Sequence, residues 1–393
     1  MKKYTEDGVD TVEGDSLSAC AGKLCASTYG NSPLIEVYDM SQGNFRGPRG
    51  YRLVQVPPDC VMTLAPDGVG TKVVVIDASF GHRKAGFDLA AMTGMDITRW
   101  GGKPLVFTNV LDTFTIGKQG DRTNVASREL LAGLVDAAKV LQMVVLNGET
   151  AELSSCVGSE NPDATVMFNW AGVAWGIYHP KKMILGDTLA PGQSIMALKD
   201  WFRSNGHSSA RKALAMHFGP KWWENPDATE TIAAVATPSM LYDPFLNHVH
   251  GWDNPDLCPI IPIHLIVHNS GGAIEDKFAK DLLFPAGLSA ELDDLFDPPQ
   301  AMKDIVTWRG MTDLDWLGTF NGGQGALVVV DPENEGQFID LAESYGVTAR
   351  RCGRIIETAA SEMPQVCVLS KFTGEWVTLK SKPKQATTDG GLR

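Results

Sequence analysis

Apolar runs that end at glycine, proline or acidic residues alternate along this chain with segments in which apolar residues recur at helical spacing. In the first half, this pattern predicts helices at 86–100 and 125–141 and strands at 61–64, 73–76, 104–112, 143–146 and 169–178. In the second half, it predicts helices at about 208–217 and 274–283, strands at 193–198, 263–267 and 326–330, and a further helix and strand before residue 356. Such alternation is typical of a mixed α/β fold.

The length of the chain predicts more than one hydrophobic core. A chain of 393 residues exceeds the size at which single cores stop growing, so two domains of similar bulk are expected. We place the boundary at the turn-rich segment 180–192, which gives an N-terminal domain at 1–179 and a C-terminal domain at 180–381. Residues 382–393 are polar and are predicted to form a disordered tail.

The acidic charge of the chain argues against two classes of partner. A protein with a net charge of −13 lacks the basic surface that supplies most of the binding energy for nucleic acids and membranes. No uncharged run is long enough to cross a bilayer, the first residues do not form a secretory signal, and the seven cysteines are scattered and odd in number. These features predict a reduced, cytoplasmic protein that binds phosphates locally, through backbone N–H groups, a few basic side chains and bridging metal ions.

The segment Asp67-Gly68-Val69-Gly70-Thr71-Lys72 contains the most informative chemistry. Its glycines lack side chains, so the backbone N–H groups of the loop can approach an anion closely. The spacing differs from that of the phosphate-binding P-loop, and an isolated glycine turn between two strands would be the simpler interpretation. Two further segments, Asn147-Gly148-Glu149-Thr150 and Ser204-Asn205-Gly206, also follow apolar runs and favour a phosphate-binding role.

Four acidic residues are candidates for binding a cation. Asp96 falls on the apolar stripe of the predicted helix at 86–100, where a carboxylate is costly to bury unless it is paired or binds a cation. Asp67, Asp112 and Glu149 lie at the ends of predicted strands, where open α/β sheets gather their ligands. The expected cation site therefore lies at one edge of a sheet.

A series of motifs occurs in one order along the chain: Tyr4 with Gly8-Val9-Asp10, Asp67 to Lys72, Asp88 to Asp96, Gly148 to Glu152, Ser204-Asn205-Gly206 with Arg211-Lys212, Ser270-Gly271-Gly272, and Phe320-Asn321 with Gly323 and Gly325. This series, which covers residues 4–356, resembles the aminoimidazole ribonucleotide synthetase family, also called phosphoribosylformylglycinamidine cyclo-ligases. The resemblance implies a two-domain ATP-binding synthetase fold of the α/β (α+β) class. The N-terminal domain would contribute strands to the barrel of a homodimer, and the C-terminal domain would be α/β.

The resemblance also implies an activity and its participants. ATP would phosphorylate the formyl oxygen of formylglycinamidine ribonucleotide, and the amidine nitrogen would attack the activated carbon, closing the imidazole ring as phosphate leaves. Mg²⁺ would be held by Asp67, Asp96, Asp112 and Glu149, and ATP by Asp67, Gly68, Gly70, Thr71, Lys72, Asp96, Asn147, Gly148, Glu149 and Thr150. The substrate phosphate would be bound at a helix start by Arg203, Ser204, Asn205, Gly206 and Arg211. The catalytic residues would be Asp67, Lys72 and Arg203.

Some positions depart from the family pattern close to the chemistry. Met95, Asn147 and Arg203 stand where the family usually has asparagine, glycine and histidine, and an arginine can hold a phosphate but cannot carry a proton near neutral pH. The third acid is ambiguous, because one alignment places it at Asn109 and another at Asp112; we favour Asp112. Two other functions stay open: another ATP-dependent enzyme of the superfamily with a different acceptor, and a catalytically silent nucleotide-binding homologue.

Several of these residues also have simple structural interpretations. Ser204 and Asn205 are common helix caps, and Asp67 suits a turn. His264 and His268 lie four residues apart on a predicted strand and could face one metal together. Two structural histidines, each with its own partners, are the better interpretation of this pair.

Overall fold

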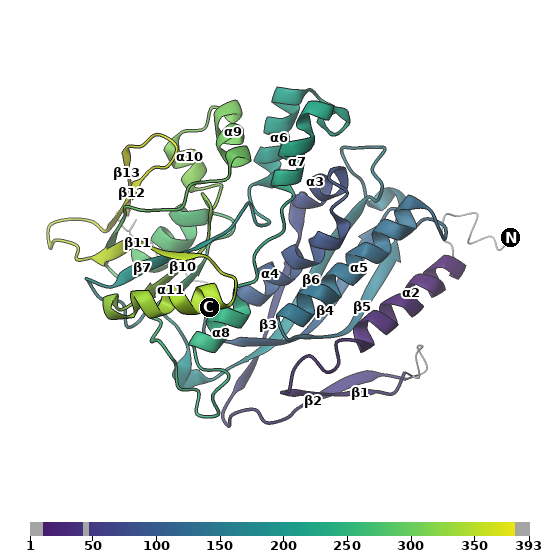
Figure 1. Ribbon diagram of the computed structural model, residues 1–393, viewed down its shortest axis with the longest axis horizontal. Helices are drawn as coiled ribbons and strands as arrows, with labels where there is room; N and C mark the ends of the chain where they lie inside the picture. The colour runs from purple at the N-terminus through teal and green to yellow at the C-terminus, as the bar shows by residue number, and fades with distance from the viewer. Residues whose placement is uncertain (1–10, 42–46, 382–393) are drawn as a thin grey trace, which may run out of the picture.

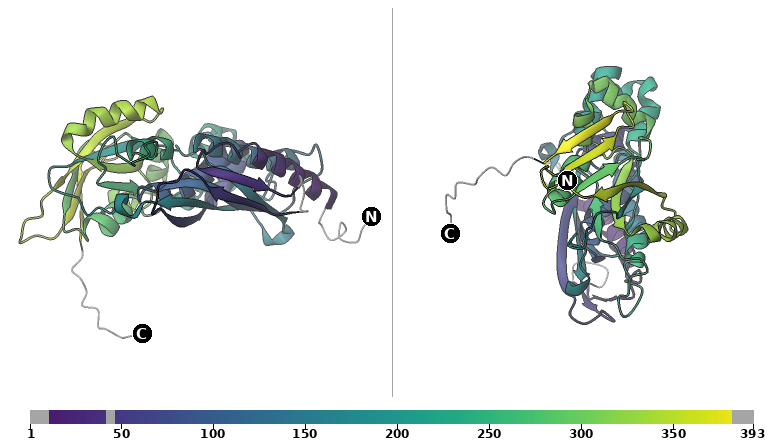
Figure 2. Two further views of the ribbon diagram at one scale, coloured as in Figure 1. Left: turned by 90° about the horizontal axis from the view of Figure 1, so that it is seen from below. Right: turned by 90° about the vertical axis from the view of Figure 1, so that its left-hand side faces the viewer.

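The computed structural model describes residues 11–41 and 47–381, so the predicted tail at 382–393 and the motif from Tyr4 to Asp10 lie outside it. The two larger sheets lie next to each other, and each is built from one half of the sequence (Figure 1). Seen from below, the molecule is elongated, with the two halves end to end (Figure 2, left). None of the helices in the described ranges has both the length and the apolar character of a membrane span.

The N-terminal sheet has the strand order β3-β6-β4-β5, in which β4 and β5 are parallel and the other neighbours are antiparallel. Its strands are β3 (Val61–Gly68), β4 (Lys103–Thr113), β5 (Val144–Glu152) and β6 (Phe168–Tyr178). Helices α4 and α5 cover one face, and α2 lies beside β5; they span Ala85–Thr98, Arg122–Val140 and Thr11–Ala26. Because side chains alternate along a strand, Phe107 and Leu111 are buried under the helices, whereas Thr108 and Val110 are exposed on the opposite face.

The opposite face of this sheet is covered in part. The antiparallel hairpin of β1 (Ile35–Asp39) and β2 (Arg49–Leu53) packs there, together with Trp252 from the C-terminal half. Trp252 Nε1 also donates a hydrogen bond to the backbone oxygen of Gly101 at 3.0 Å. Beyond this cover, apolar side chains of the edge strand β3 remain in contact with solvent.

The C-terminal sheet has the strand order β13-β12-β9-β11-β7-β10-β8 and is antiparallel except for the pair β12 and β9. Its strands are β7 (Ser194–Lys199), β8 (Leu265–His268), β9 (Ser289–Leu292), β10 (Gln324–Val330), β11 (Ala349–Ile356), β12 (Gln365–Leu369) and β13 (Trp376–Lys380). One face packs against α6 (His207–Phe218), α7 (Thr229–Val235), α9 (Gln300–Arg309), α10 (Asp313–Leu317) and the π-helix η7 (Ile274–Leu283). The other face packs against α8 (Asp243–Val249) and α11 (Glu335–Ser344). The strands covered on both faces therefore have continuous apolar sequences.

The mixed α/β class is confirmed, and most predicted elements are present with ends shifted by a few residues. The predicted strand at 73–76 is wrong, because these residues form helix α3 (Val73–Ala78). Val74 and Val75 pack into the C-terminal core and Ile76 packs into the N-terminal core. A helix that is buried on several sides has a continuous apolar sequence, and its β-branched residues favour a strand by propensity alone.

Two further differences concern the length of β5 and the number of strands. Strand β5 continues to Glu152, so the motif from Asn147 to Thr150 lies within the strand instead of after it. Strands β12 and β13 follow residue 356, beyond the last predicted strand. The predicted domain boundary near residue 180 stays a prediction; β6 ends at Tyr178 and β7 begins at Ser194.

Candidate active site

One row of residues crosses the N-terminal sheet at the level of the glycine loop. Backbone pairing across β3, β6, β4 and β5 aligns Asp67, Gly172, Asn109 and Gly148. Asn109 is buried on the helix-covered face, whereas Asp112 lies three residues further along β4 and, by the alternation of the strand, on the opposite face. The structure therefore aligns Asn109 with Asp67, and not the favoured Asp112.

Asp67, on β3, and Asp96, on α4, form a pair of neighbouring acids. Burial raises the pKa of Asp67, and the charge of Asp96 adds to this rise while the charge of Lys277 opposes it. Burial also acts to raise the pKa of Asp96, but a hydrogen bond from His268 and the charges of Arg99 and Lys277 outweigh burial, so this pKa is lowered. Two partly buried carboxylates that repel each other in this way would be stabilised by a cation between them.

A Mg²⁺ ion bound together with a nucleotide fits this pair. Mg²⁺ is usually held by one or two carboxylates and completes its coordination with phosphate oxygens and water. Among the residues that the structure describes, no group of three or more His, Cys, Asp or Glu side chains is arranged to hold a metal ion. The structure does not bring the four predicted acids together: Asp67 and Asp96 are neighbours, but Asp112 lies on the opposite face and Glu149 lies on β5 at the far edge of the sheet.

His268 connects Asp96 to Arg203. Its Nε2 lies 3.0 Å from Nη2 of Arg203, and its Nδ1 lies 3.1 Å from Oδ1 of Asp96. Because a guanidinium group has donors and no acceptor, Nε2 of His268 must accept, and Nδ1 must carry the proton and donate to Asp96. Burial lowers the pKa of His268 to about 4, which keeps the ring neutral at neutral pH. The orientation of the Asp96 carboxylate is thus held by an imidazole in one tautomer.

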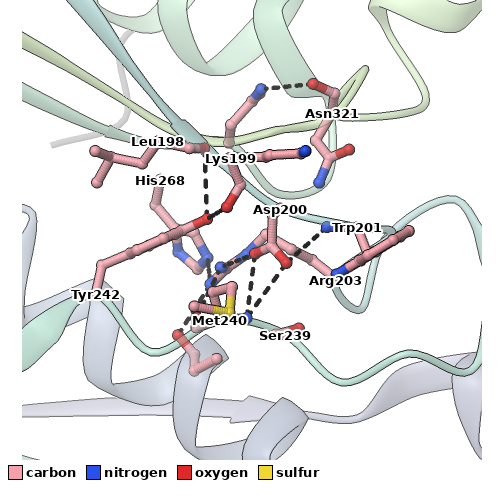
Figure 3. Close-up of polar contacts among 12 residues, drawn as sticks. Leu198, Lys199, Asp200, Trp201, Arg203, Ser239, Met240, Tyr242, His268 and Asn321 are labelled. Atoms are coloured by element: carbon pink, nitrogen blue, oxygen red, sulfur yellow. Dashed lines mark hydrogen bonds and ion pairs between the residues drawn. The ribbon is translucent and has the colours of Figure 1, made fainter. Parts of the chain in front are cut away.

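Arg203 is fully buried, with 0% of its surface exposed. Its Nη1 lies 2.7 Å from Oδ2 of Asp200 and also donates to the backbone oxygen of Met240 (Figure 3). Its Nη2 donates to the backbone oxygen of Ala91. A substrate phosphate could bind this group only if these internal partners were released. The structure therefore places Arg203 beneath the site, where it supports His268, instead of at the predicted contact with substrate.

Lys72 is also buried and already paired. Its Nζ lies 2.8 Å from Oδ1 of Asp88 and 2.7 Å from the backbone oxygen of Thr237, which belongs to the C-terminal half. The same Oδ1 of Asp88 accepts a hydrogen bond from Oγ of Ser239 at 2.6 Å. This buried pair joins the two halves, so the predicted contact between Lys72 and a phosphate would require the pair to break.

The two predicted phosphate loops lie next to each other although they come from different halves of the chain. Oγ1 of Thr71 lies 3.2 Å from Oγ of Ser208, at the start of α6. A Cβ atom at Gly70 would lie 3.9 Å from the backbone oxygen of Ser204. The exposed backbone of the glycine loop thus faces the beginning of α6.

Ser204 and Asn205 do not cap α6, whose N-cap is Gly206 with a φ of +76° and no side-chain cap bond. Oγ of Ser204 and Oδ1 of Asn205 are instead buried without a hydrogen-bond partner among the described residues. Nδ2 of Asn205 donates to the backbone oxygen of Thr319 at 3.0 Å, which fixes the direction of the amide. Buried polar atoms without partners are costly, and a bound ligand would satisfy them.

Arg211 lies in the second turn of α6 and is partly exposed. Its Nη1 lies 3.6 Å from Oε2 of Glu160, and its Nε is buried without a partner among the described residues. Its guanidinium therefore retains a donor for a ligand, in contrast to that of Arg203.

The remaining predicted ATP residues line a different cavity. A volume of about 260 Å³ lies between α2, Arg49 and the end of β5, and its lining includes Asn147, Gly148, Glu149 and Thr150. Gly148 also belongs to the row that contains Asp67, so the cavity and the acid pair lie about 14 Å apart, three strand spacings, along one line across the sheet. The structure thus separates the predicted nucleotide residues into two groups at opposite edges of the sheet.

His264 does not share a site with His268. Its Nε2 lies 3.0 Å from Oδ1 of Asp331, and its Nδ1 lies 2.9 Å from Oγ1 of Thr188. Each histidine has its own partners, so the structural interpretation of this pair is confirmed.

Sequence reasoning missed two side chains near the acid pair. His268 was interpreted as structural, and Lys277 carried no motif of its own. The signal that could have found both is the glycine turn Ser270-Gly271-Gly272, which lies between β8 and η7 in the sequence.

Comparison with known protein families gives one match in each half of the chain. Residues 51–174 match the family described as "AIR synthase related protein, N-terminal domain", and residues 190–363 match "AIR synthase related protein, C-terminal domain". A phosphoribosylformylglycinamidine cyclo-ligase of Rippkaea orientalis is 28% identical over 363 residues, which cover 90% of this chain and 96% of that protein. The corresponding protein of Paraburkholderia xenovorans is 28% identical, with 93% and 95% covered.

Solved structures share the fold at much lower identity. The hydrogenase maturation protein HypE in complex with ATP has a TM-score of 0.57 at 13% identity, covering 85% of this chain and 88% of that one. Thiamine-monophosphate kinase from Stenotrophomonas maltophilia also has a TM-score of 0.57 at 13% identity, covering 87% and 94%. The two matches to the family together span most of the described structure, and the chain belongs to the AIR synthase related protein family.

Proposed function

We propose that the protein is an ATP-dependent cyclo-ligase that converts formylglycinamidine ribonucleotide to aminoimidazole ribonucleotide, releasing ADP and phosphate in purine biosynthesis. The relatives that match over most of this chain carry the name of that enzyme. The observation that carries the proposal is the meeting of two loops across the halves of the molecule. One offers exposed backbone N–H groups beside Asp67, and the other offers the unpartnered atoms of Ser204 and Asn205.

The reaction needs two phosphate-bearing molecules to be held against each other. ATP would place its terminal phosphate at the glycine loop, where the backbone N–H groups of Gly70 and Thr71 would donate to phosphate oxygens; those of Gly68 and Val69 already donate to Oδ1 of Asp67 and the backbone oxygen of Trp170. The substrate would place its own phosphate at the start of α6, near Ser204, Asn205 and Arg211. The formyl oxygen would then attack the terminal phosphorus as the bond to ADP breaks. The amidine nitrogen would next attack the formyl carbon as phosphate leaves and the ring closes.

Most of the catalytic effect in such a reaction comes from positioning and charge neutralisation. Asp67 and Asp96 would hold Mg²⁺, which when bound neutralises charge between the phosphate groups. In this proposal Lys72 and Arg203 act as internal supports, because both are fully buried and paired with carboxylates. Asp67 keeps its predicted catalytic role.

The adenosine part would occupy the cavity between α2 and β5. This cavity is lined by the predicted residues from Asn147 to Thr150, together with Arg49. One of them, Gly148, is aligned with Asp67 across the sheet.

We further propose that the protein is a homodimer in the cytoplasm. The uncovered face of the N-terminal sheet exposes 68% of Met62 and 64% of Leu64 on strand β3, and Val110 lies on the same face. Exposed apolar side chains that gather on one sheet face favour a protein interface. Light scattering should give the mass of two chains, and the substitution Leu64→Asp should shift it toward one; a wild-type monomer would contradict the dimer.

A different acceptor remains the second candidate, and one observation favours it. Within the site, His207 and His268 are both buried with lowered pKa values of about 3 and about 4, so neither is suited to exchange protons near neutral pH. A reaction that requires histidine as a proton carrier would not be served by these groups.

Purified protein with ATP, Mg²⁺ and formylglycinamidine ribonucleotide tests these functions together. Formation of the aminoimidazole product supports the cyclo-ligase. Nucleotide binding without that product supports a different acceptor, and no nucleotide binding supports a silent homologue. The substitution Asp67→Asn should abolish Mg²⁺-dependent ATP turnover while the circular dichroism spectrum stays unchanged; unchanged turnover would remove Asp67 from the site.

A further inference from the structure

Lys277 is a half-buried lysine that forms no hydrogen bond or salt bridge with any residue in the described ranges. It lies near the beginning of η7, a π-helix from Ile274 to Leu283. Helices of this type are rare and occur often at functional sites. A lysine that is partly desolvated and unpaired in this position has the properties of a ligand-binding group.

The chain around Lys277 brings it to the acid pair. His268, at the end of β8, contacts Asp96 across the two halves at 3.1 Å. The chain then turns sharply, with φ values of +82° at Gly272 and +44° at Ala273, and η7 begins at the next residue. The first turn of η7 therefore starts close to the contact between the halves.

The electrostatics agree with this placement. The charge of Lys277 opposes the rise in the pKa of Asp67 that burial causes, and it adds to the lowering of the pKa of Asp96. Both acids belong to the N-terminal half, whereas Lys277 belongs to the C-terminal half. The charge of Lys277 thus acts on both carboxylates, and Lys277 forms no direct ion pair with either.

Two other lysines provide a contrast. Lys280, one turn further along η7, is paired with Glu275 at 2.7 Å and Asp276 at 2.8 Å. Lys72, in the glycine loop, is enclosed with Asp88. Both are already neutralised by a carboxylate, whereas Lys277 has its three donors available.

We propose that Lys277 contacts the phosphate oxygens of the nucleotide bound at the glycine loop, the role that the sequence motif suggests for Lys72. This inference rests on the proposed function and names a further residue for it. An ammonium group donates to phosphate oxygens as a compact positive charge and would balance the negative charge brought in beside Asp67 and Asp96. No covalent bond to Lys277 forms or breaks when the phosphoryl group moves from ATP to the acceptor oxygen and ADP leaves.

The proposal predicts two effects of opposite sign for Lys277→Met. The dissociation constant for MgATP should rise by about 10- to 100-fold, because hydrogen bonds to charged groups are lost. The affinity for Mn²⁺ alone, followed by electron paramagnetic resonance without nucleotide, should increase, because a positive charge beside the carboxylates is gone. A purely structural role for Lys277 would not raise one affinity and lower the other.

Lys280→Met is the matched control, since it removes the same charge three residues away, and it should change neither affinity by more than about twofold. Lys277→Arg keeps the charge and should bind MgATP more tightly than Lys277→Met but more weakly than the wild-type protein. If Lys277→Met does not fold, the MgATP affinity of Lys277→Arg is the measurement that tests the proposal. MgATP binding by Lys277→Met at wild-type strength would overturn the inference alone. Failure of the wild-type protein to bind MgATP would instead overturn the proposed function, and this inference with it.

Discussion

The two loops that meet at the site use their polar groups differently. In the loop from Asp67 to Lys72, the lysine is buried in a pair with Asp88, and a ligand would meet backbone and one half-buried acid. In the loop from Ser204 to Gly206, the side chains are directed by the fold, yet Oγ of Ser204 and Oδ1 of Asn205 have no partner among the described residues. The first loop therefore stabilises the contact between the halves, whereas the second leaves buried polar atoms that need a ligand.

This difference shows what a motif specifies. Glycine spacing determines where backbone can approach an anion, and Gly70 and Gly206 have the positive φ values that glycine adopts readily. It does not determine whether a neighbouring basic side chain is available, because this depends on carboxylates from distant segments. The contrast between the loops can be tested by removing the groups that distinguish them.

The largest effect is expected for Lys72→Met. Removing one partner of a buried ion pair leaves Asp88 as an unpaired buried charge, which costs about 3–5 kcal/mol of unfolding free energy. Urea denaturation followed by tryptophan fluorescence measures this loss. Lys84→Met, at an exposed lysine near the start of α4, is the control and should change stability by about 0.5 kcal/mol or less.

The double variant Lys72→Met with Asp88→Leu should recover part of the loss, because the uncompensated charge is then absent. If Lys72→Met kept wild-type stability and lost only nucleotide affinity, the comparison of the loops would be reversed. Lys72 would then be the phosphate contact that the motif suggests.

The fold was largely accessible from sequence because its elements follow strong local patterns. The strand from Lys103 to Thr113 and the helix from Arg122 to Val140 show clear periodicity and short turns. Helix α3 was not accessible, because its burial against two cores removes the polar face that marks a helix. Pairing between distant segments, such as that of Lys72 with Thr237, is likewise not encoded in local pattern.

The candidate site was accessible at the level of loops but not of side chains. The glycine loop and the start of α6, each predicted from the sequence to bind a phosphate, lie next to each other in the structure. Asn109 lies in line with Asp67 because of the register in which β3, β6 and β4 pair. A shift of one residue would move the side chains of β4 to the other face of the sheet, and sequence spacing does not determine this register. The tautomer of His268 follows from a guanidinium 65 residues away in the chain and could not be anticipated from either residue alone.

The next largest effect is expected for alanine substitutions at Gly206 and Gly70, one in each loop. A Cβ atom at Gly206 would lie 2.4 Å from Cε1 of Phe320, and its φ is +76°. A Cβ atom at Gly70, with a φ of +62°, would have no neighbour closer than 3.9 Å. Gly206→Ala should therefore cost about 2–4 kcal/mol from strain and overpacking, and Gly70→Ala about 1–2 kcal/mol from strain alone.

Unfolding free energies of the two alanine variants, measured side by side in urea, test this difference. Equal losses would mean that Phe320 moves without cost, and that the second loop is no more tightly built than the first.

Acid should lower the unfolding free energy through His207, the residue that follows the second loop. Burial and the charges of Lys72 and Arg211 lower the pKa of His207 to about 3, so the folded state keeps the ring neutral. The unfolded chain binds a proton near pH 6.5, so this part of the stability is present above pH 6.5 and is lost as the pH falls toward 3; the loss is about 2 kcal/mol near pH 5.

Urea denaturation between pH 8 and pH 5 measures this loss. His207→Gln retains an N–H donor for the backbone oxygen of Arg203 but does not titrate, so its stability should fall less steeply with acid than that of the wild-type protein. Parallel curves for the two proteins would show that His207 does not contribute to the acid sensitivity.

The smallest effect on stability, and the most informative one about ligand binding, is expected for Ser204→Ala. Oγ of Ser204 has no partner in the described structure, so its removal should leave the unfolding free energy unchanged or slightly raised. Affinity for formylglycinamidine ribonucleotide, measured by calorimetry, should fall by about tenfold, because a hydrogen bond to a phosphate is lost. Ser209→Ala, further along α6, removes a hydroxyl group that already has partners in Met311 and Arg309, and should lower stability slightly without changing this affinity. If both serine variants bound the substrate equally well, the unpartnered hydroxyl would be a local packing defect, and the two loops would differ in stability alone.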